Sequence, residues 1–314
     1  MNDHEYDAIV IGSGISGGWA AKELCDKGMK TLVLERGRDV KHLVDYPTMT
    51  TPPWEMPHRN QIPLKEKVAD PVVNRCYAYK EDTQHFFVKD SDHPYIQDKP
   101  FDWIRGYQVG GKSLIWARQP QRWSRFEFER PARDGYGIEW PISYDDLAPW
   151  YSYVEKFVGI SGSYEGLETL PDSEFLPAWE LNCVEKEVQK RIKAAYPDRH
   201  PIGGRCAHLT EPKPEHLEQG RGQCMARNQC YRGCPFGGYF SSNSATLPHA
   251  AKTGNLTLRP DSVVHSIIWD DEKGKVTGVR VIDRVSKESS EYFAKVIFLN
   301  AGPPVFLAYS VIAL

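Results

Sequence analysis

The chain has 314 residues, of which 40% are hydrophobic and 26% charged, and its formal net charge at pH 7 is −3. This length allows one large domain or two moderate ones, each with its own hydrophobic core. The small net charge and the scattered basic residues argue against nucleic acid or an anionic membrane as a partner. No apolar run approaches the roughly 18–20 residues that a membrane-spanning helix needs.

The beginning of the chain predicts a β-α-β unit. Asp7 to Ile11 form a short apolar strand of the buried parallel type. A helical stretch follows from Ile15 to Lys27, and Gly28 can end it. Thr31 to Leu34 then predict a second buried strand.

A glycine-rich turn with the pattern G-x-G-x-x-G connects this first strand to the helix. Gly12 permits the tight turn, Gly14 lets the backbone approach a pyrophosphate, and Gly17 lets the helix pack close to the sheet. The first helical turn, which contains Ser16, offers unbonded N–H groups to phosphates. Glu35 ends the second strand 18 positions after Gly17, where a carboxylate can accept hydrogen bonds from a ribose diol.

Together, the turn, its flanking elements and the acidic residue predict a dinucleotide site. The alternative is a glycine-rich turn beside a surface glutamate, because glycines cluster in many turns. Glu35 itself argues against a phosphate on the ribose, whereas the adjacent Arg36 keeps that point open.

The remaining elements follow from hydrophobic patterning. Residues 37–103 lack a clear period but are rich in aromatics, so we expect an ordered excursion rather than a disordered linker. Apolar side chains at spacings of three and four predict helices over Tyr144–Val158 and Val184–Tyr196. Runs of β-branched residues predict three strands near the end of the chain, over Val263–Trp269, Val276–Asp283 and Tyr292–Leu299.

A second glycine-rich motif reads GYQVGGKSLIW from Gly106 onward. It resembles the signature of the glucose–methanol–choline (GMC) oxidoreductase family, whose members carry FAD. In that family this segment runs along the flavin. The resemblance therefore implies cofactor contacts from Gly110, Gly111 and Ser113, with Trp116 nearby.

The resemblance extends through most of the chain. Phe126 to Gly159 is similar to the family's segment after the signature, and Ser241 to Pro248 to its link back to the flavin domain. Val264 matches a residue whose backbone faces adenine. Lys295 to Gly302 resembles the strand that returns under the FAD, which adds Gly302 to the implied site.

The implied fold class is α/β: an FAD/NAD(P)-binding Rossmann-like domain of GMC type with an inserted, incomplete substrate or cap domain. We expect the FAD-binding core and its covering excursion over 1–140, a cap segment with clustered cysteines over 141–250, and the return to the FAD-binding domain over 251–314.

Two departures from the family pattern bear on the chemistry. Ile115 stands where some sugar-oxidising members carry a histidine bonded to the flavin, so we expect non-covalent FAD. The family's catalytic histidine, paired with another histidine or an asparagine, lies beyond the position where this chain stops. We therefore expect an incomplete chain and assign no catalytic residue. His208, His216 and His249 are expected to be surface or loop residues.

Three of the seven cysteines lie within eleven residues: Cys224, Cys230 and Cys234. Thiolates suit iron and zinc, and three ligands match a three-iron, four-sulfur cluster. The spacing resembles a subset of the family, the cytochrome-linked sugar and alcohol dehydrogenases. The alternatives are a zinc site completed by His208 or Cys206, and buried thiols that bind nothing.

The sequence thus favours an FAD-dependent oxidoreductase that acts on CH–OH groups of a sugar, polyol or sugar acid and passes electrons to an acceptor other than oxygen. One rival is a catalytically inactive fragment that binds FAD. A flavoenzyme using NAD(P)H would need a second G-x-G-x-x-G between a strand and a helix, and none is present.

The resemblance also implies partners: a small subunit and a cytochrome as electron acceptor. The start of the chain shows no basic segment followed by an apolar one. This favours the cytoplasm, whereas export with a signal-bearing partner subunit would place the protein in the periplasm.

Overall fold

The computed structural model describes residues 4–302. The chain forms two compact units, each drawn from separate stretches of sequence. The first unit comprises Met1–Trp116, Asn228–Pro235 and Ser241–Leu314, and the second Ala117–Arg227 and Phe236–Phe240. The expected domain boundaries after residues 140 and 250 stay a prediction.

A six-stranded sheet forms the centre of the first unit. Its strands are β1 (Glu5–Ile11), β2 (Thr31–Leu34), β5 (Leu256–Arg259), β6 (Ser262–Asp270), β7 (Lys275–Asp283) and β8 (Ser289–Leu299). They lie in the order β5-β2-β1-β8-β7-β6. The first four in this order run parallel, and β7 and β6 continue antiparallel. This confirms the expected α/β class.

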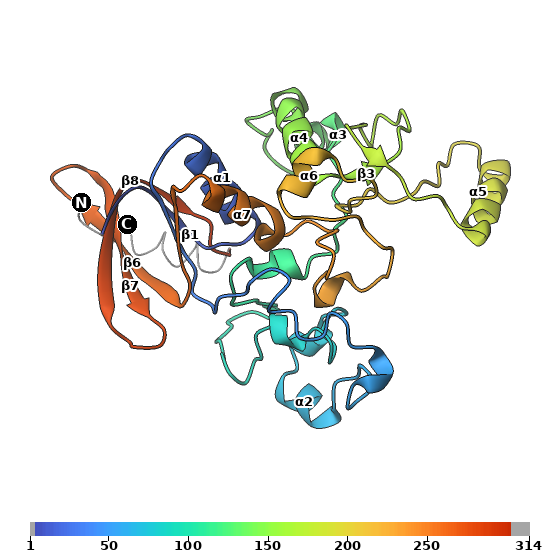
Figure 1. Cartoon of the computed structure of the whole chain (residues 1–314). Helices are drawn as coiled ribbons and strands as arrows, with labels where there is room; N and C mark the ends of the chain where they lie inside the picture. The colour runs from blue at the N-terminus through green and yellow to red at the C-terminus, as the bar shows by residue number, and fades with distance from the viewer. Residues whose placement is uncertain (1–3, 303–314) are drawn as a thin grey trace. The chain divides into compact units, whose positions relative to one another are not determined.

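Two helices cover one face of the parallel strands. Helix α1 (Ile15–Asp26) packs against α7 (Leu247–Lys252); α1 contacts β1 and β2, and α7 contacts β5 (Figure 1). The core beneath them consists of buried side chains from strands, helices and one loop: Ala8, Val10, Ala21, Leu24, Val33, Val109 and Leu247. The observed α1 ends one residue before the predicted end at Lys27.

The antiparallel strands close the opposite face. On this face, the side chains of β1 and β2 that point away from α1 pack against residues of β6, β7 and β8. This second core consists of Ile9, Ile11, Leu32, Leu34, Val264, Val279, Val281 and Tyr292. Register shifts interrupt the pairing of β6 and β7 at two places, and such bulges increase the twist of a sheet. Strand β6 consequently contacts β2, although three strands separate them in the sheet order.

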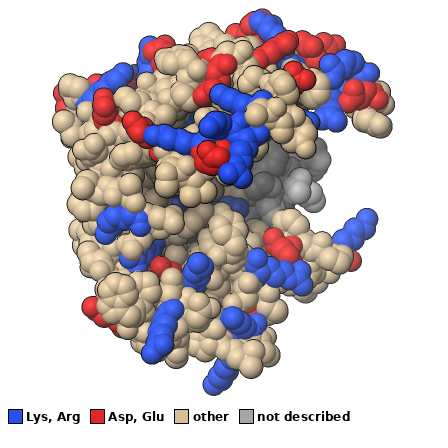
Figure 2. All heavy atoms as spheres, turned by 90° about the vertical axis from the view of Figure 1, so that its right-hand side faces the viewer, with Lys and Arg blue, Asp and Glu red and all other residues tan. Residues whose placement is uncertain are grey.

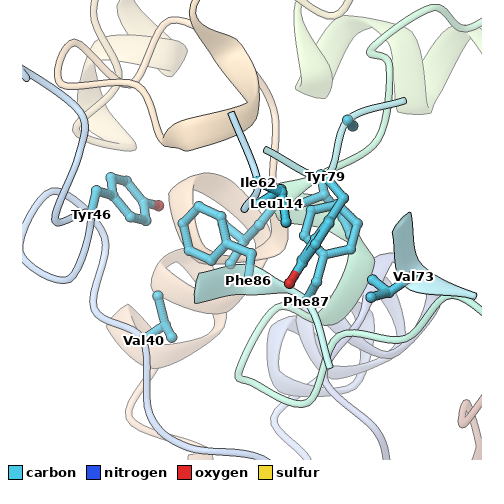
Figure 3. Packing of buried hydrophobic residues seen from close by; sticks show 10 residues of the cluster. Val40, Tyr46, Ile62, Val73, Tyr79, Phe86, Phe87 and Leu114 are labelled. Carbon is cyan, nitrogen blue, oxygen red and sulfur yellow. The ribbon is translucent and has the colours of Figure 1, made fainter. Parts of the chain in front are cut away.

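The excursion after β2 is ordered, as expected. It contains the short helix α2 (Leu64–Ala69) and three 3₁₀ turns, η1 (Pro53–Glu55), η2 (Val73–Arg75) and η3 (Gln84–Phe86). The aromatics of this segment build a separate hydrophobic cluster around the fully buried Phe86 (Figure 3). Its other labelled members are Val40, Tyr46, Ile62, Val73, Tyr79, Phe87 and Leu114.

The regular elements of the second unit are mostly helices. Its elements are α3 (Arg125–Arg133), α4 (Tyr144–Val158), β3 (Ser161–Gly162), β4 (Leu176–Pro177), α5 (Cys183–Ala195) and α6 (Pro214–Glu218). Helix α4 has its predicted bounds because both ends carry signals. Ser143 accepts a hydrogen bond from the backbone N–H of Asp146 at the start, and Gly159 ends the helix with φ of 74°.

The predicted apolar face of α5 is exposed, with Val184 at 67% and Val188 at 46% of full exposure.

Basic and acidic residues lie intermixed over the face of the described chain shown in Figure 2. Near α5, Lys186 pairs with Glu180 in a surface ion pair. Between residues 4 and 302, no helix is both long and apolar enough to cross a bilayer.

Candidate functional site: a glycine-lined dinucleotide cradle

The loop between β1 and α1 has a shape that its glycines make accessible. Gly12 adopts φ of +98°, a conformation that other residues rarely take. A Cβ atom on Gly17 would lie 1.8 Å from the carbonyl oxygen of Gly12, so only glycine lets α1 start this close to β1. Beside Gly14, in contrast, no described atom lies within 4 Å of an added Cβ. The start of α1 therefore has room for a ligand, as a phosphate site requires.

Ser13 and Glu35 hold this loop in place. The carboxylate of Glu35 accepts hydrogen bonds from the backbone N–H of Ser13 at 3.1 Å and from its hydroxyl at 2.6 Å. It also accepts one from the N–H of Gly37 at 2.9 Å. Glu35 is only 6% exposed, so the carboxylate anchors the turn. The expected contact of Glu35 with a ribose diol stays a prediction. A carboxylate has roughly four lone-pair sites, so about one is left for a ribose hydroxyl.

The second glycine motif lies against the first. The N–H of Gly110 donates to the Ser13 hydroxyl at 2.9 Å. A Cβ atom on Gly111 would lie 3.4 Å from the Cα of Gly14. Gly111 begins a 3₁₀ turn, η4 (Gly111–Leu114), in which the buried Ser113 hydroxyl donates to the Gly110 carbonyl at 2.6 Å. Two motifs nearly a hundred residues apart thus form one backbone-lined cradle.

A third segment, which comes much later in the sequence than the two glycine motifs, completes the cradle. The short π-helical turn η6 (Ser242–Thr246) precedes α7. The Ser242 N–H donates to the Ser113 hydroxyl at 3.0 Å, and the Ser242 hydroxyl donates to the Gly14 carbonyl at 3.0 Å. Asn243 donates through its amide to the carbonyls of Val40 and Val109.

Three buried polar oxygens around the cradle have no hydrogen-bond partner within residues 4–302: Asn243 Oδ1, Thr246 Oγ1 and Asn300 Oδ1. Leaving such an atom unsatisfied costs about 1–3 kcal/mol. Asn243 Oδ1 would lie 1.6 Å from a Cβ atom on Gly110, and Thr246 Oγ1 would lie 2.4 Å from one on Gly18, whereas Asn300 meets Gly12 and Gly17 through its backbone and Cβ. Unsatisfied polar atoms beside glycines that cannot be enlarged fit a cradle that receives a polar ligand.

The other predicted site residues occupy varied positions. Ser16 is exposed in the first turn of α1, and Trp116 is partly buried just after η4. Val264 lies in β6 within the core, and Gly302 follows β8. Arg36 stacks on the ring of Tyr107. Their contacts with a cofactor stay predictions.

Sequence patterns did not indicate Ser13, Gly37, Ser242 or Asn243 as site residues. Ser13 stands between two selected glycines, and Ser242 lies in a segment already identified as a link to the flavin domain. Only the fold shows that their polar groups meet, because these contacts span up to 228 positions of sequence.

The clustered cysteines are divided between the two units. Cys224 belongs to the second unit, whereas Cys230 and Cys234 belong to the first. Among the residues that the structure describes, no group of three histidine, cysteine or acidic side chains is placed to hold a metal ion. The three-iron, four-sulfur cluster stays a prediction, and nothing below depends on it.

One histidine differs from expectation. His216 was expected at the surface or in a loop, yet it is 1% exposed in α6. Its Nδ1 accepts from the Lys213 N–H at 3.1 Å, so its Nε2 carries the proton that it donates to the Lys156 carbonyl at 3.0 Å. Burial lowers the pKa of His216, as this neutral form requires. Burial also lowers the pKa of His208 to about 4.

Replacing Glu35 with glutamine is expected to change how stability depends on pH. Burial raises the pKa of Glu35, although Ser13 and Gly37 donate to the carboxylate. A raised pKa favours the protonated folded state, so this contribution to stability is present at low pH. It is lost as pH rises from the ordinary glutamate pKa through the raised one.

Urea unfolding of both proteins from pH 4 to 8 measures this effect. The free energy of unfolding of the parent chain should fall relative to Glu35→Gln as pH rises, and the difference should then level off. Parallel curves across this range would show that Glu35 titrates alike in the folded and unfolded states.

Comparison with known proteins places this cradle in a family. The sequence profile described as GMC oxidoreductase matches residues 6–312. The large subunit of fructose dehydrogenase from Gluconobacter japonicus is 25% identical over 94% of this chain and 52% of its own length. The 2-methyl-1,2-propanediol dehydrogenase of Mycolicibacterium austroafricanum is 27% identical over 98% of this chain and 51% of its own length.

The gluconate 2-dehydrogenase flavoprotein of Pantoea cypripedii is 24% identical, covering 90% of this chain and 48% of its own length. A solved structure of formate oxidase from Aspergillus oryzae RIB40 shares 16% identity and a TM-score of 0.46, over 95% of this chain and 46% of that one. The chain spans about half the length of the curated relatives that it matches. With the profile matched from residue 6 to residue 312, the chain belongs to the GMC oxidoreductase family.

Proposed function

We propose that this chain binds FAD, without a covalent bond, as part of an oxidoreductase that acts on CH–OH groups. The observation that carries the proposal is the joining of two glycine motifs through Ser13, which donates to Glu35 and accepts from Gly110. This contact makes one continuous cradle of backbone and glycine, open at Gly14. Membership of a family of oxidoreductases supports the redox role.

Residues of the chain would bind and orient the cofactor. Backbone N–H groups at the start of α1 would receive the diphosphate, and Gly14 and Gly111 would let it approach without an intervening side chain. Glu35 fixes the turn at one end of the cradle, and Ser113 ties η4 to Gly110 and Ser242. Bound FAD would supply the hydride acceptor for the oxidation of a substrate carbinol.

The names of the relatives support the substrate class. They describe dehydrogenases of a sugar, a diol and a sugar acid. We therefore propose a sugar, polyol or sugar acid as the donor and an acceptor other than oxygen. One relative is named as a large subunit, which supports assembly with a smaller partner subunit. A cytochrome acceptor follows only from the resemblance seen in the sequence.

The test is to purify the chain with FAD, record its flavin absorption, and precipitate it with acid. We expect flavin in the native protein and its release into the supernatant, because Ile115 cannot bond it. Turnover is then measured with a panel of sugars, polyols and sugar acids, using either dichlorophenolindophenol or oxygen as acceptor. Bound flavin without turnover would support the rival function of an inactive FAD-binding chain. Failure to bind flavin would defeat the proposal.

A further inference from the structure

Arg36 directly follows Glu35 just after the end of β2. Its guanidinium carbon lies 3.7 Å from the centre of the Tyr107 ring. Within the described residues, the Arg36 side chain makes this ring contact but no hydrogen bond or ion pair. The side chain is only partly buried. A planar cation is therefore held by stacking while its N–H groups are left to other partners.

The backbone fixes this stack. A Cβ atom on Gly37 would lie 2.0 Å from the carbonyl carbon of Tyr107, so the two segments touch where Arg36 leaves the strand. The N–H of Val109 donates to the Arg38 carbonyl at 2.9 Å, and Arg38 forms a parallel bridge with Gln108. The loop after β2 thus runs alongside the approach to the second glycine motif.

The Tyr107 ring is itself held by its neighbours. The His93 ring meets it edge-on, with the ring centroids 5.2 Å apart. The guanidinium of Arg105, a residue only 5% exposed, lies 5.7 Å from its centre and donates to the His93 carbonyl. Contacts on several sides restrict the ring, so Tyr107 offers Arg36 a preorganised platform.

This platform lies where the adenosine half of a dinucleotide belongs. In β-α-β dinucleotide sites the acidic residue at the end of the second strand marks the ribose. The Glu35 carboxylate already accepts three hydrogen bonds from Ser13 and Gly37. Strand β6 starts at the same place, since the N–H of Ser262 donates to the Glu35 carbonyl. With Glu35 largely committed to the turn, recognition of adenosine needs a further group.

We propose that Arg36, stacked on Tyr107, is a positioning residue for the adenine ring of FAD. The guanidinium would form the middle layer between the phenol ring and the base, because its plane can stack on both. This inference rests on the proposed function, since it presupposes that the cradle holds FAD. It gives Tyr107, which belongs to the second glycine-rich motif, a part distinct from that of the glycines.

A competing use of Arg36 is to clamp a phosphate on the ribose, since guanidinium binds phosphate through two N–H groups. FAD carries no such phosphate, so the two uses differ in ligand. Stacking requires the plane of the guanidinium and the ring beneath it. A phosphate clamp requires only the N–H groups and the charge.

The test compares the parent chain with Arg36→Lys, Tyr107→Leu, Tyr107→Phe and, as a control, Arg284→Lys, whose side chain pairs with Asp261. Flavin fluorescence gives the Kd of FAD, competition gives that of ADP and 2′,5′-ADP, and thermal unfolding without ligand reports stability. Arg36→Lys and Tyr107→Leu should weaken both FAD and ADP about fivefold to tenfold. Tyr107→Phe and Arg284→Lys should stay within about twofold.

The outcomes separate the inference from the proposed function. A parent chain that does not bind FAD defeats both. A parent chain that binds FAD, with unchanged affinity in Arg36→Lys and Tyr107→Leu, overturns the inference and leaves the proposed function standing. Tight binding of 2′,5′-ADP relative to ADP, lost in Arg36→Lys, would show a phosphate clamp instead of a stack. Weaker binding that accompanies a lower melting temperature without ligand would show a merely structural role.

Discussion

Replacing Gly17 with alanine is expected to lower the melting temperature of the chain by about 4–10 °C and to abolish measurable FAD binding. The added Cβ would lie 1.8 Å from the carbonyl oxygen and 2.9 Å from the carbonyl carbon of Gly12. Both are backbone atoms, so α1 or the phosphate loop must move to accommodate the methyl group. That movement separates the start of α1 from Ser13 and Gly110. Thermal unfolding without ligand and flavin fluorescence with FAD measure the two effects.

Gly14→Ala is the matched control, because the same substitution there meets no described atom within 4 Å. Its backbone, with φ of −64° and ψ of −166°, is one that alanine adopts readily. We expect the melting temperature without FAD to change by no more than about 1–2 °C, and FAD affinity to fall at least about tenfold. Equal loss of stability in both variants, or full FAD affinity in Gly14→Ala, would contradict this account of the cradle.

Glu155→Ala is expected to destabilise the second unit by about 3–5 kcal/mol, as removal of one partner from a buried ion pair typically does. Glu155 accepts hydrogen bonds from Arg122 at Nε, at 3.1 Å, and at Nη2, at 2.6 Å. Arg122 is only 7% exposed, so the substitution leaves its charge buried without a carboxylate. Ser152 and Tyr144 accept further hydrogen bonds from the guanidinium but cannot neutralise it. Urea unfolding measures the loss.

The control for this prediction is Asp145→Ala, which removes the partner of Arg125. Both side chains are more than half exposed, at 61% and 55%. Exposed ion pairs contribute little, so the free energy of unfolding should change only slightly. A loss in Asp145→Ala as large as that in Glu155→Ala would show that burial does not set the difference between the two pairs.

Local patterns were sufficient to predict the elements of the first β-α-β unit. The apolar run before Gly12 and the run ending at Leu34 became β1 and β2, and the stretch from Ile15 became α1. Short apolar strands bounded by glycines can be predicted from sequence because the hydrophobic pattern and the turn residues indicate the same structure. The spacing of apolar residues likewise predicted α4, and in the structure Ser143 and Gly159 mark its two ends.

The partners of these elements could not be predicted in the same way. Periodicity shows which face of a strand is buried, but not which strand lies beside it. Nothing local to β1 or β8 indicates that Ile9 pairs in register with Ile297. The resemblance to a family indicated only a strand over Lys295–Gly302 that returns under the FAD, and the structure shows that β8 pairs with β1 and in which register.

The residues of the candidate site could likewise be predicted only in part. The glycines were predictable because backbone conformation and close approach restrict a position to glycine. Ser13, Ser242 and Asn243 were not, because a serine or an asparagine in a polar turn carries no sign of its distant partner. The stack of Arg36 on Tyr107 is of the same kind, since 71 positions of sequence separate the two.

The position of β8 beside β1 constrains how this protein folds during its synthesis. During synthesis β1 leaves the ribosome long before β8, its neighbour on one side, which is complete only at Leu299. Until then one edge of β1 is unpaired, and the side chains of Ile9 and Ile11, on the face opposite α1, lack their final cover, which is a setting for aggregation. Contacts so distant in sequence also favour slow folding. Because η6 also joins the cradle late, a ligand that binds only the assembled cradle would stabilise the chain only after residues 242–246 have been made.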